Sequence, residues 1–507
     1  MARHPDHHAH DGAHESGHQP GSPKSGAHDH GAPGDGAHDR GSHDHAPHEP
    51  AGAHHTAHGQ TGHAPVAHEP SPESRAAYLR ALEEAVPDPG RTVVAVDLDA
   101  REVDWSFLPG STLPAWGYNG QVPGPVLSAR VGDVLEVRLT NSLPEPTSIH
   151  WHGLRIPAAM DGTDMVQWPV RPGETFTYRF RLPDAGTFWY HPHTHETVQL
   201  EKGLYGALVV RDEAVPTLDA ERVLVLDDLK VDKQGRIAPF GGVLERHDGR
   251  EGDWRLVNGR VEPELAMAGG TIERWRIVNA SSARYIRLSI GGAPFRLLGT
   301  DGGLIEAPVS MTEVLLTPAD RVDLAVGPFA EGTELVVEAL RYGRRASRTR
   351  KAERFATVRV GPSAPSVAEI PEGLRAIRPL ADADAPPTRT VTLGFRLSPR
   401  RGVDFVINRQ RHYQDAAVKA GELQIWDVVN ATMMDHPFHL HGFFFQVLAV
   451  NGLPPPFRSW EDTVNVPPKG TVRLAWLPDD RCGSWMYHCH ILEHHESGMM
   501  GHFDVVP

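Results

Sequence analysis

The chain has 507 residues, more than one ordinary domain holds, so two to four domains are expected. Its formal net charge of -15 at pH 7 argues against a nucleic-acid partner, because no basic face is available to neutralise phosphates. Glycine (50) and proline (44) are abundant, and short valine-rich runs alternate with turn residues, a pattern typical of all-β sandwiches.

Residues 1–72 form a histidine-rich N-terminal segment. Of the 32 histidines, 17 lie in residues 1–70, among Gly, Ala, Asp and Pro. This composition predicts a disordered tail, since it cannot bury enough apolar surface to offset chain entropy. The tail is either a flexible leader or a loose chelator of copper or another divalent metal. No apolar stretch typical of a secretory signal is visible, and no run of 18 apolar residues predicts a transmembrane helix.

After the tail, residues 78–86 (YLRALEEAV) predict a short amphipathic helix, and an internal repeat follows. Its copies begin at Asn119, Asn258 and Asn408, which are 139 and 150 residues apart. Each copy contains a turn, a glycine and an alternating apolar strand that ends in Asn. A period of domain size predicts one β-sandwich used three times. We expect these domains at residues 90–212, 213–365 and 385–507.

Histidine clusters follow the first and third copies of the repeat, whereas the middle copy continues as ASSARYIRL and is expected to be a spacer or wall. In a strand, residues i and i+2 face the same side, so an H-x-H unit directs two imidazoles to one place. Buried imidazoles without partners are costly, and shared metal ions are therefore the expected explanation. The four clusters are HWH at 150–152, HPH at 191–193, HPFHLH at 436–441 and HCH at 488–490.

Cys489 lies between His488 and His490, so in a strand its side chain points to the opposite face. A thiolate with two imidazoles and a weak axial methionine is the ligand set of a blue-copper electron-transfer site. The eight remaining cluster histidines suit a small copper cluster, and zinc is disfavoured because it has no redox states. The chain bonds around Cys489 would then form a short path for electrons. The blue-copper ligands would be His436, Cys489, His494 and Met499.

Over residues 90–507 these motifs resemble the multicopper oxidases, in the three-domain bacterial laccase-like branch. The resemblance implies three tandem cupredoxin-like Greek-key β-sandwich or barrel domains and four copper ions: one type 1, one type 2 and two type 3. It makes His436 the exposed type 1 ligand, near which electrons enter. The implied ligands are His150 and His439 for type 2; His152, His191 and His490 for one type 3 copper; His193, His441 and His488 for the other; and His436, Cys489, His494 and Met499 for type 1.

The resemblance also implies a copper-dependent oxidoreductase with O2 as acceptor. Four one-electron oxidations of phenols or aromatic amines at the type 1 site would be coupled to reduction of O2 to water at the trinuclear cluster. Cuprous ion is the alternative donor, because Met433, Met434 and Asp435 lie beside His436. A non-catalytic copper-binding scaffold is a second alternative, although all twelve ligand positions are filled. Location in the periplasm or outside the cell would follow from the family, and a monomer is favoured.

Protons must also reach the oxygen site. Asp161, in PAAMDGTD, occupies the position where related bacterial oxidases have a carboxylate near the type 2 copper. Many of these relatives have a glutamate directly after the last type 1 histidine, where this chain has His495 followed by Glu496. Either residue is a candidate for the second proton relay.

Overall fold

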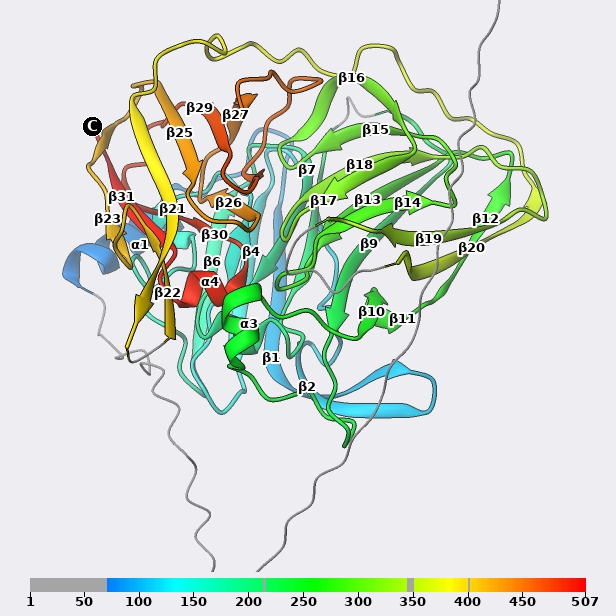
Figure 1. Ribbon diagram of the computed structural model, residues 1–507, viewed down its shortest axis with the longest axis horizontal. Helices are drawn as coiled ribbons and strands as arrows, with labels where there is room; N and C mark the ends of the chain where they lie inside the picture. The colour runs from blue at the N-terminus through cyan, green and yellow to red at the C-terminus, as the bar shows by residue number, and fades with distance from the viewer. Residues whose placement is uncertain (1–70, 213–215, 344–350, 400–401) are drawn as a thin grey trace, which may run out of the picture. The chain divides into compact units, whose positions relative to one another are not determined.

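The computed structural model describes residues 71–212, 216–343, 351–399 and 402–507, and most of its regular structure is β-strand (Figure 1). The all-β prediction is confirmed. The predicted tail lies outside the described residues, except for its last two. Within the described ranges six sheets fall into three successive pairs along the chain. The three domain boundaries remain our proposal.

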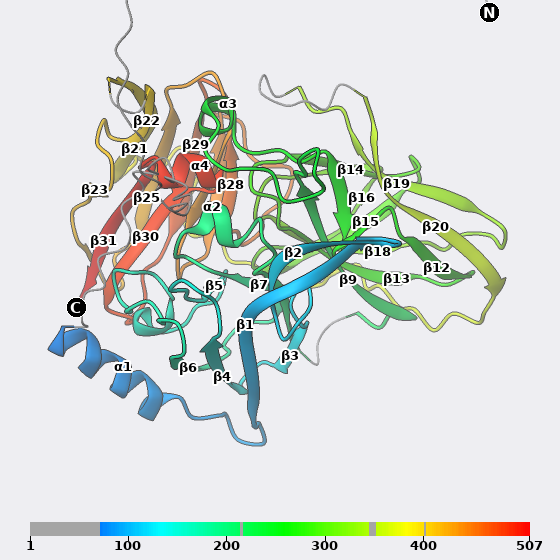
Figure 2. The ribbon, with the colours of Figure 1, turned by 90° about the horizontal axis from the view of Figure 1, so that it is seen from below.

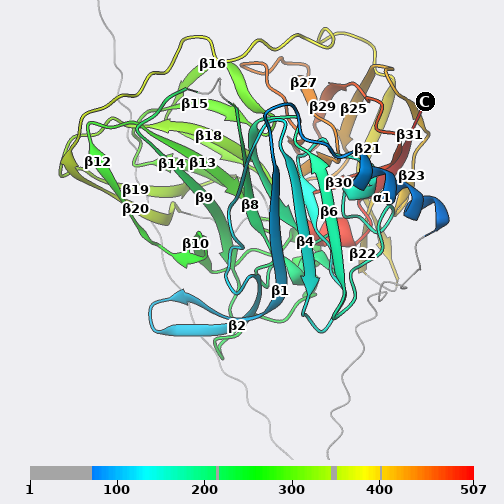
Figure 3. The same ribbon diagram turned by 180° about the vertical axis from the view of Figure 1, so that it is seen from behind.

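The first pair of sheets encloses a core of leucine and aromatic side chains, and Figure 3 shows β1, β4 and β6 side by side. One sheet has the order β2-β1-β4-β6 and the other β3-β8-β7-β5. The bounds are β1 (Val93–Leu108), β2 (Ser111–Tyr118), β3 (Leu127–Arg130), β4 (Val134–Asn141), β5 (His150–His152), β6 (Thr175–Arg181), β7 (Gly186–His191) and β8 (Gly206–Arg211), with a short 3-10 helix, η1, at Ala158–Met160.

The middle pair has its own core, rich in valine, leucine and isoleucine. Its sheets have the orders β11-β10-β9-β13-β18-β15-β16 and β12-β20-β19-β14-β17. The bounds are β9 (Ala220–Leu229), β10 (Trp254–Val257), β11 (Arg260–Val261), β12 (Glu264–Gly269), β13 (Glu273–Asn279), β14 (Ile286–Ile290), β15 (Phe295–Thr300), β16 (Gly303–Met311), β17 (Glu313–Leu316), β18 (Arg321–Val326), β19 (Glu334–Leu340) and β20 (Glu353–Ser363).

The last pair carries the third core, which includes Cys489 and Met499. Its sheets have the orders β22-β21-β25-β29-β27 and β23-β31-β30-β26-β28, and β24 also pairs with β31. The bounds are β21 (Arg389–Ser398), β22 (Gly402–Ile407), β23 (Tyr413–Gln414), β24 (Val418–Lys419), β25 (Gln424–Asn430), β26 (His436–Leu440), β27 (Phe445–Val450), β28 (Thr463–Val466), β29 (Thr471–Trp476), β30 (Gly483–Cys489) and β31 (Met500–Val506).

The predicted N-terminal helix is α1 (Pro72–Glu84), which begins six residues earlier than the sequence pattern indicated. Ser71 caps it by accepting a hydrogen bond from the Ser74 backbone N–H at 3.1 Å, and Pro72 takes the first helical position. These two signals start a helix regardless of apolar periodicity. The other helices are short: α2 (Glu196–Gln199), α3 (Val243–Asp248) and α4 (Leu492–Glu496).

The predicted repeat is confirmed by its turns. Asn119, Asn258 and Asn408 have φ angles of 54°, 50° and 46°, in the left-handed region that Asn tolerates better than most residues. In each copy the Asn Oδ1 accepts a hydrogen bond from a backbone N–H in the first strand, at 2.7, 2.8 and 2.8 Å. That first strand pairs in parallel with the strand after the turn, as β1–β4, β9–β13 and β21–β25.

A second asparagine ends the repeated strand in each copy. Asn141, Asn279 and Asn430 are buried, and each Oδ1 accepts the backbone N–H two residues later, at 2.9, 3.1 and 2.8 Å. Their amide groups donate to carbonyls of the following loop, those of Glu145, Arg284 and Met434. The three copies therefore begin this loop in the same way, and only the first and third lead into histidine-bearing strands.

Candidate metal centre

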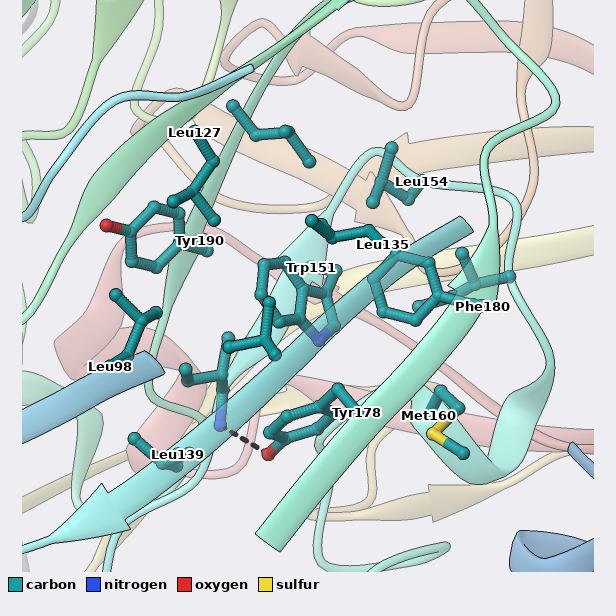
Figure 4. Packing of buried hydrophobic residues seen from close by; sticks show 14 of the residues in the cluster. Leu98, Leu127, Leu135, Leu139, Trp151, Leu154, Met160, Tyr178, Phe180 and Tyr190 are labelled. Atoms are coloured by element: carbon teal, nitrogen blue, oxygen red, sulfur yellow. Dashed lines mark hydrogen bonds between the residues drawn. The ribbon is translucent and has the colours of Figure 1, made fainter. Parts of the chain in front are cut away.

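Trp151, between the two histidines of HWH, packs in the first core against Tyr178, Phe180 and Tyr190, with ring centroids 5.5, 5.3 and 5.7 Å away (Figure 4). Alternation along β5 therefore turns both neighbouring imidazoles to the other face of the sheet. The neighbouring strand β7 brings the HPH motif alongside, because His150 pairs with His191 in antiparallel register.

The third pair of sheets presents its histidines by the same alternation. In β26 and β30 the partners are Phe438 with Cys489 and His439 with His488, and the His490 backbone N–H donates to the Pro437 carbonyl at 2.7 Å. Every second side chain in each strand faces the HWH and HPH motifs, and the side chains between them face the third core.

Eight imidazoles from the first and third pairs of sheets meet in one cluster, and seven of them are buried. The two predicted type 3 triads are compact. In one, the ring centroids of His152, His191 and His490 lie 5.1 to 5.7 Å apart. In the other, His193, His441 and His488 lie 5.1 to 5.4 Å apart. The predicted type 2 pair, His150 and His439, lies 5.8 Å apart.

The predicted type 1 ligands lie on the opposite face. Cys489 Sγ is 3.5 Å from His436 Nδ1 and 3.6 Å from His494 Nδ1, and these nitrogens are 3.2 Å apart. Met499 is fully buried in the same core, and its carbonyl accepts a hydrogen bond from the Cys489 backbone N–H at 3.1 Å. Cys489 thus belongs to one group of side chains while its two neighbours belong to the other.

The expectation that His436 is an exposed ligand is wrong. His436 and His494 are both fully buried. The His436 Nε2–H donates to Thr432 Oγ1 at 2.8 Å, and the His494 Nε2–H donates to the His247 carbonyl at 3.0 Å. His247 lies in α3, which packs against α4, the short helix that carries His494 (Figure 1). Sequence periodicity gave no sign of this because α3 belongs to an irregular connection in the middle pair of sheets.

The side chains beside His436 have different surroundings. Met433 is 52% exposed, whereas Met434 is buried in the third core. Asp435 is also buried, and its Oδ1 accepts hydrogen bonds from Tyr342 Oη at 3.0 Å and Asn465 Nδ2 at 2.9 Å. Of these three residues, Met433 is therefore the one that faces solvent.

Asp161 is buried between a histidine of the predicted type 2 site and a histidine of a predicted type 3 site. Its carbonyl accepts a hydrogen bond from His150 Nδ1 at 2.8 Å, and its Oδ2 accepts one from His441 Nδ1 at 2.9 Å. Gly162 allows this approach: its φ is +85°, and a Cβ there would overlap the Ile149 carbonyl. The loop can therefore lie directly against the start of β5.

His495 and Glu496, the two candidates for the second proton relay, differ in burial and in the side chains that they contact. His495 is buried, and its ring stacks on His488 with centroids 4.2 Å apart. Glu496 is exposed and accepts hydrogen bonds from the Thr197 backbone N–H and hydroxyl at 3.1 and 2.7 Å. Figure 2 shows the two short helices involved, α2 and α4, beside each other. Only His495 of these two reaches the histidine cluster.

Glu196 is a site residue that sequence reasoning missed. It is buried, with Oε1 3.1 Å from His191 Nδ1 and Oε2 2.8 Å from His495 Nδ1. Burial raises its pKa, but His193 and the hydrogen bonds from His191 and His495 outweigh this, so the pKa lies well below its ordinary value. Its position next to the HPH motif was the available signal. The left-handed turn at His195 (φ 47°) precedes Glu196 and begins α2.

The ring nitrogens of the cluster fit metal ions. His441 Nδ1 and His488 Nδ1 donate to oxygen acceptors, so both Nε2 atoms carry lone pairs, and these nitrogens face each other at 3.0 Å. Such an arrangement repels unless a cation lies between the two atoms. Burial also lowers the pKa of seven of the eight imidazoles, which keeps them neutral and able to ligate: His152, His191, His193, His439, His441, His488 and His490.

Comparison with known proteins decides the family. Two multicopper oxidase family models match residues 99–215 and 385–507. Multicopper oxidase MmcO of Mycobacterium tuberculosis is 33% identical over 475 residues, covering 85% of this chain and 90% of that protein. The chain belongs to the multicopper oxidase family.

Solved structures of multicopper oxidases share the fold. A Campylobacter jejuni enzyme described as a metallo-oxidase has a TM-score of 0.73 and 33% identity, covering 82% of this chain and 91% of that one. A multicopper oxidase from Pseudomonas thermotolerans has a TM-score of 0.72 and 35% identity, covering 82% and 100%. The cupredoxin-like architecture expected from the sequence is thereby confirmed.

As a multicopper oxidase, the chain is a copper-dependent oxidoreductase that uses O2. Copper suits the donor set, since imidazole and thiolate with a nearby methionine are its preferred ligands. Bound there, copper supplies one-electron redox chemistry and the activation of O2. Among the described residues, no helix has both the length and the apolar character needed to cross a membrane.

Proposed function

We propose that this multicopper oxidase couples four one-electron oxidations of a donor to the reduction of O2 to two waters. Four electrons and four protons are consumed for each O2, so the reaction balances without release of a partly reduced oxygen species. The observation that carries this proposal is Cys489, whose Sγ lies among type 1 candidates while His488 and His490 lie in the histidine cluster.

Four copper ions are proposed, with the ligands expected from the sequence. His436, Cys489, His494 and Met499 would hold type 1, and His150 with His439 would hold type 2. Orphaned nitrogens support the cluster assignment: His150, His191, His193 and His439 Nε2, His152 Nδ1 and both His490 nitrogens are buried without a hydrogen-bond partner among the described residues. The two type 3 sites would be His152, His191 and His490, and His193, His441 and His488.

Proton delivery is proposed to use two groups on different sides of the cluster. Asp161 would hold a proton at Oδ1, since Oδ2 accepts the His441 Nδ1–H, and pass it towards the oxygen site. His495 would do so on the other side, oriented by Glu196 through its Nδ1. Glu496 is the less favoured candidate for this relay, because its carboxylate accepts a hydrogen bond from Thr197 and does not contact the histidine cluster.

Phenols and aromatic amines are proposed as the first class of donor. Electron transfer needs no direct contact with the type 1 imidazoles, and the His247 peptide gives a route one hydrogen bond long from the surface segment α3 to His494 Nε2. The electron would then pass through Cys489 to His488 and His490.

Cuprous ion is the second candidate donor. It is supported by the exposed thioether of Met433, three residues before His436, because a soft ligand suits a monovalent copper ion. The description of the Campylobacter jejuni relative as a metallo-oxidase points the same way. The burial of both type 1 imidazoles also suits a small donor more than a bulky one.

The deciding experiment measures O2 consumption by copper-loaded protein with a phenol and with cuprous ion on the same preparation, with and without residues 1–70. Water as the product, in a ratio of four donor electrons to each O2, is the expected result. Accumulation of hydrogen peroxide, fewer than four coppers per chain, or no absorption near 600 nm would each contradict the proposal.

A further inference from the structure

Arg321 begins β18 in the middle pair of sheets, whose strands contain no histidine, yet its side chain reaches both of the other pairs. It is fully buried. Its Nη1 and Nη2 donate to the two carboxylate oxygens of Asp462, the former at 2.8 Å. Its Nε donates to the carbonyl of Thr187 in β7 at 3.2 Å, and Asp301 Oδ1 lies 3.2 Å from Nη1. The guanidinium therefore lies where the three repeats meet.

Asp462 connects this arginine to two cluster histidines. Its Oδ1 accepts the His152 Nε2–H at 3.1 Å, and its carbonyl accepts the His439 Nδ1–H at 3.0 Å. The two imidazoles stack with centroids 3.8 Å apart and planes 17° apart, so a shift of one displaces the other. These histidines are assigned to different copper sites, type 3 and type 2.

The hydrogen bond to Asp462 decides which nitrogen of His152 can bind a metal. Because a carboxylate only accepts, His152 must be protonated at Nε2, and its lone pair is at Nδ1. Nδ1 is one of the buried nitrogens that have no partner among the described residues. Loss of the Asp462 acceptor would let the tautomer and the ring orientation change.

The ion pair is packed directly against the chain next to His152. Gly153 follows His152 with φ +87°, and a Cβ there would overlap Arg321 Nη2 and lie 2.7 Å from Asp462 Oδ2. Asp301 adds a second constraint, because its Oδ2 accepts the backbone N–H groups of Asp462 and Thr463 at 3.3 and 3.1 Å. The carboxylate of Asp462 is thus fixed by groups of the middle repeat.

We propose that Arg321 is a positioning residue of the copper cluster: through Asp462 it holds His152 with Nδ1 turned towards the metal. The middle repeat, expected from its sequence to be a spacer or wall, then supplies part of the scaffold that sets the cluster geometry. This inference rests on the proposed assignment of His152 and His439 as copper ligands.

A matched control distinguishes the positioning of His152 from the general stabilisation of the contacts between the three repeats. Arg276 is also buried in the middle pair, and its Nη1 donates to Asp323 Oδ2 and to Thr187 Oγ1 of the first pair at 3.0 and 3.1 Å. It makes an equivalent contact between repeats, but none of its hydrogen bonds goes to Asp462. Arg276→Met should therefore lower the melting temperature without altering the cluster.

The experiment compares Arg321→Met, Arg321→Lys and Arg276→Met as full chains that are stripped of copper and titrated with it. Copper per chain, the type 2 electron paramagnetic resonance signal and the absorption near 600 nm are recorded, with melting temperature as the measure of folding. We expect Arg321→Met to retain the 600 nm band, to bind cluster copper about 10- to 100-fold more weakly and to change the type 2 signal. Arg321→Lys should recover part of this affinity.

A wild-type type 2 signal and full copper affinity in Arg321→Met would overturn the inference, and a fall in melting temperature alone would reduce Arg321 to a structural role. If Arg321→Met does not fold, Asp462→Asn decides in the same way, because it keeps the side-chain size and removes the charge that Arg321 pairs with. A wild-type chain that fails to bind cluster copper would contradict the proposed function instead.

Discussion

Asp161 joins two histidines that are proposed ligands of different coppers: its carbonyl accepts His150 Nδ1–H at 2.8 Å, and its carboxylate accepts His441 Nδ1–H at 2.9 Å. The main chain of one residue therefore orients a type 2 candidate while its side chain orients a type 3 candidate. A substitution of the side chain leaves the first contact in place, which makes the proton role separable from ligand positioning.

We expect Asp161→Asn to lower kcat about 100-fold, because the amide can still accept from His441 but cannot hold a transferable proton. Copper content and the rate of anaerobic reduction of the type 1 site should stay at wild-type values. Stopped-flow measurement of the anaerobic and aerobic steps checks this. Asp164→Asn, at an exposed position three residues on, is the control, and an equal loss there would remove the special role of Asp161.

The second relay is tested by a pair of neighbours. His495→Gln should lower kcat about tenfold or more and shift the pH profile, since it removes the ring that contacts Glu196 and stacks on His488. Glu496→Gln should leave both nearly unchanged, because its carboxylate faces Thr197 at the protein surface. Steady-state kinetics between pH 5 and 8 provide the measurement. The reverse ranking of the two variants would assign the relay to Glu496.

Met499→Leu should raise the potential of the type 1 site while the blue colour persists, because a weak thioether ligand stabilises the oxidised state. Redox titration followed at 600 nm is the measurement. Met500→Leu is the neighbouring control, since Met500 Sδ lies 2.9 Å from His412 Nδ1 and not in the buried core. An unchanged potential in Met499→Leu would exclude Met499 from the site.

Met433→Leu distinguishes the two donor classes. If cuprous ion is a physiological donor, loss of the exposed thioether should lower kcat/KM for cuprous ion, while kcat/KM for a phenol should stay within about twofold. Both are measured as O2 uptake on one preparation. Equal effects on the two donors would indicate altered folding or altered type 1 chemistry, and no effect on either would remove Met433 from donor recognition.

Glu201 predicts how stability depends on pH. Burial raises its pKa from 4.5 to about 7, although Arg250 opposes this. In the unfolded chain Glu201 loses its proton near pH 4.5, whereas in the folded protein it keeps the proton up to about pH 7. The free energy of unfolding therefore falls as pH rises from about 4.5 to 7, by about 3 kcal/mol in total. Glu201→Gln should lack this loss. The difference in melting temperature between the variant and wild type should therefore increase in favour of the variant from pH 4.5 to 7 and stay constant above pH 7.

Thermal unfolding of copper-loaded protein at intervals between pH 4.5 and 8 measures the effect. Glu84→Gln, on an exposed turn of α1, is the control and should follow wild type at every pH. A constant difference between Glu201→Gln and wild type would show that Glu201 does not titrate in this range.

The parts of the site that follow from short-range periodicity could be predicted from the sequence. Alternation in β26 and β30 puts His439, His488 and His490 on one face and Cys489 on the other, and the repeated asparagines mark equivalent loops. Contacts that depend on how the repeats pack could not be predicted. Arg321 meets Asp462 across 141 residues of sequence, and nothing in TPADRVDL distinguishes it from an ordinary residue at the start of a strand.

The burial of His436 and the role of Glu196 have the same explanation. The contact between α3 and His494 comes from an irregular connection whose path depends on the surface it packs against, so no sequence period encodes it. Glu196 lies next to a recognised motif, but its contact with His191 follows a left-handed residue, His195, and the sequence pattern does not reveal that turn.

The pairing of β26 with β30 limits how such enzymes can diverge. Because neighbouring side chains alternate between faces, gain or loss of one residue inside β30 would exchange the thiolate and its neighbouring imidazoles between the two proposed redox centres. The same change inside β26 would exchange the faces of its histidines. Length changes in descendants or in engineered chimeras should therefore accumulate in the connections, and grafting experiments should exchange these two strands only as an aligned unit.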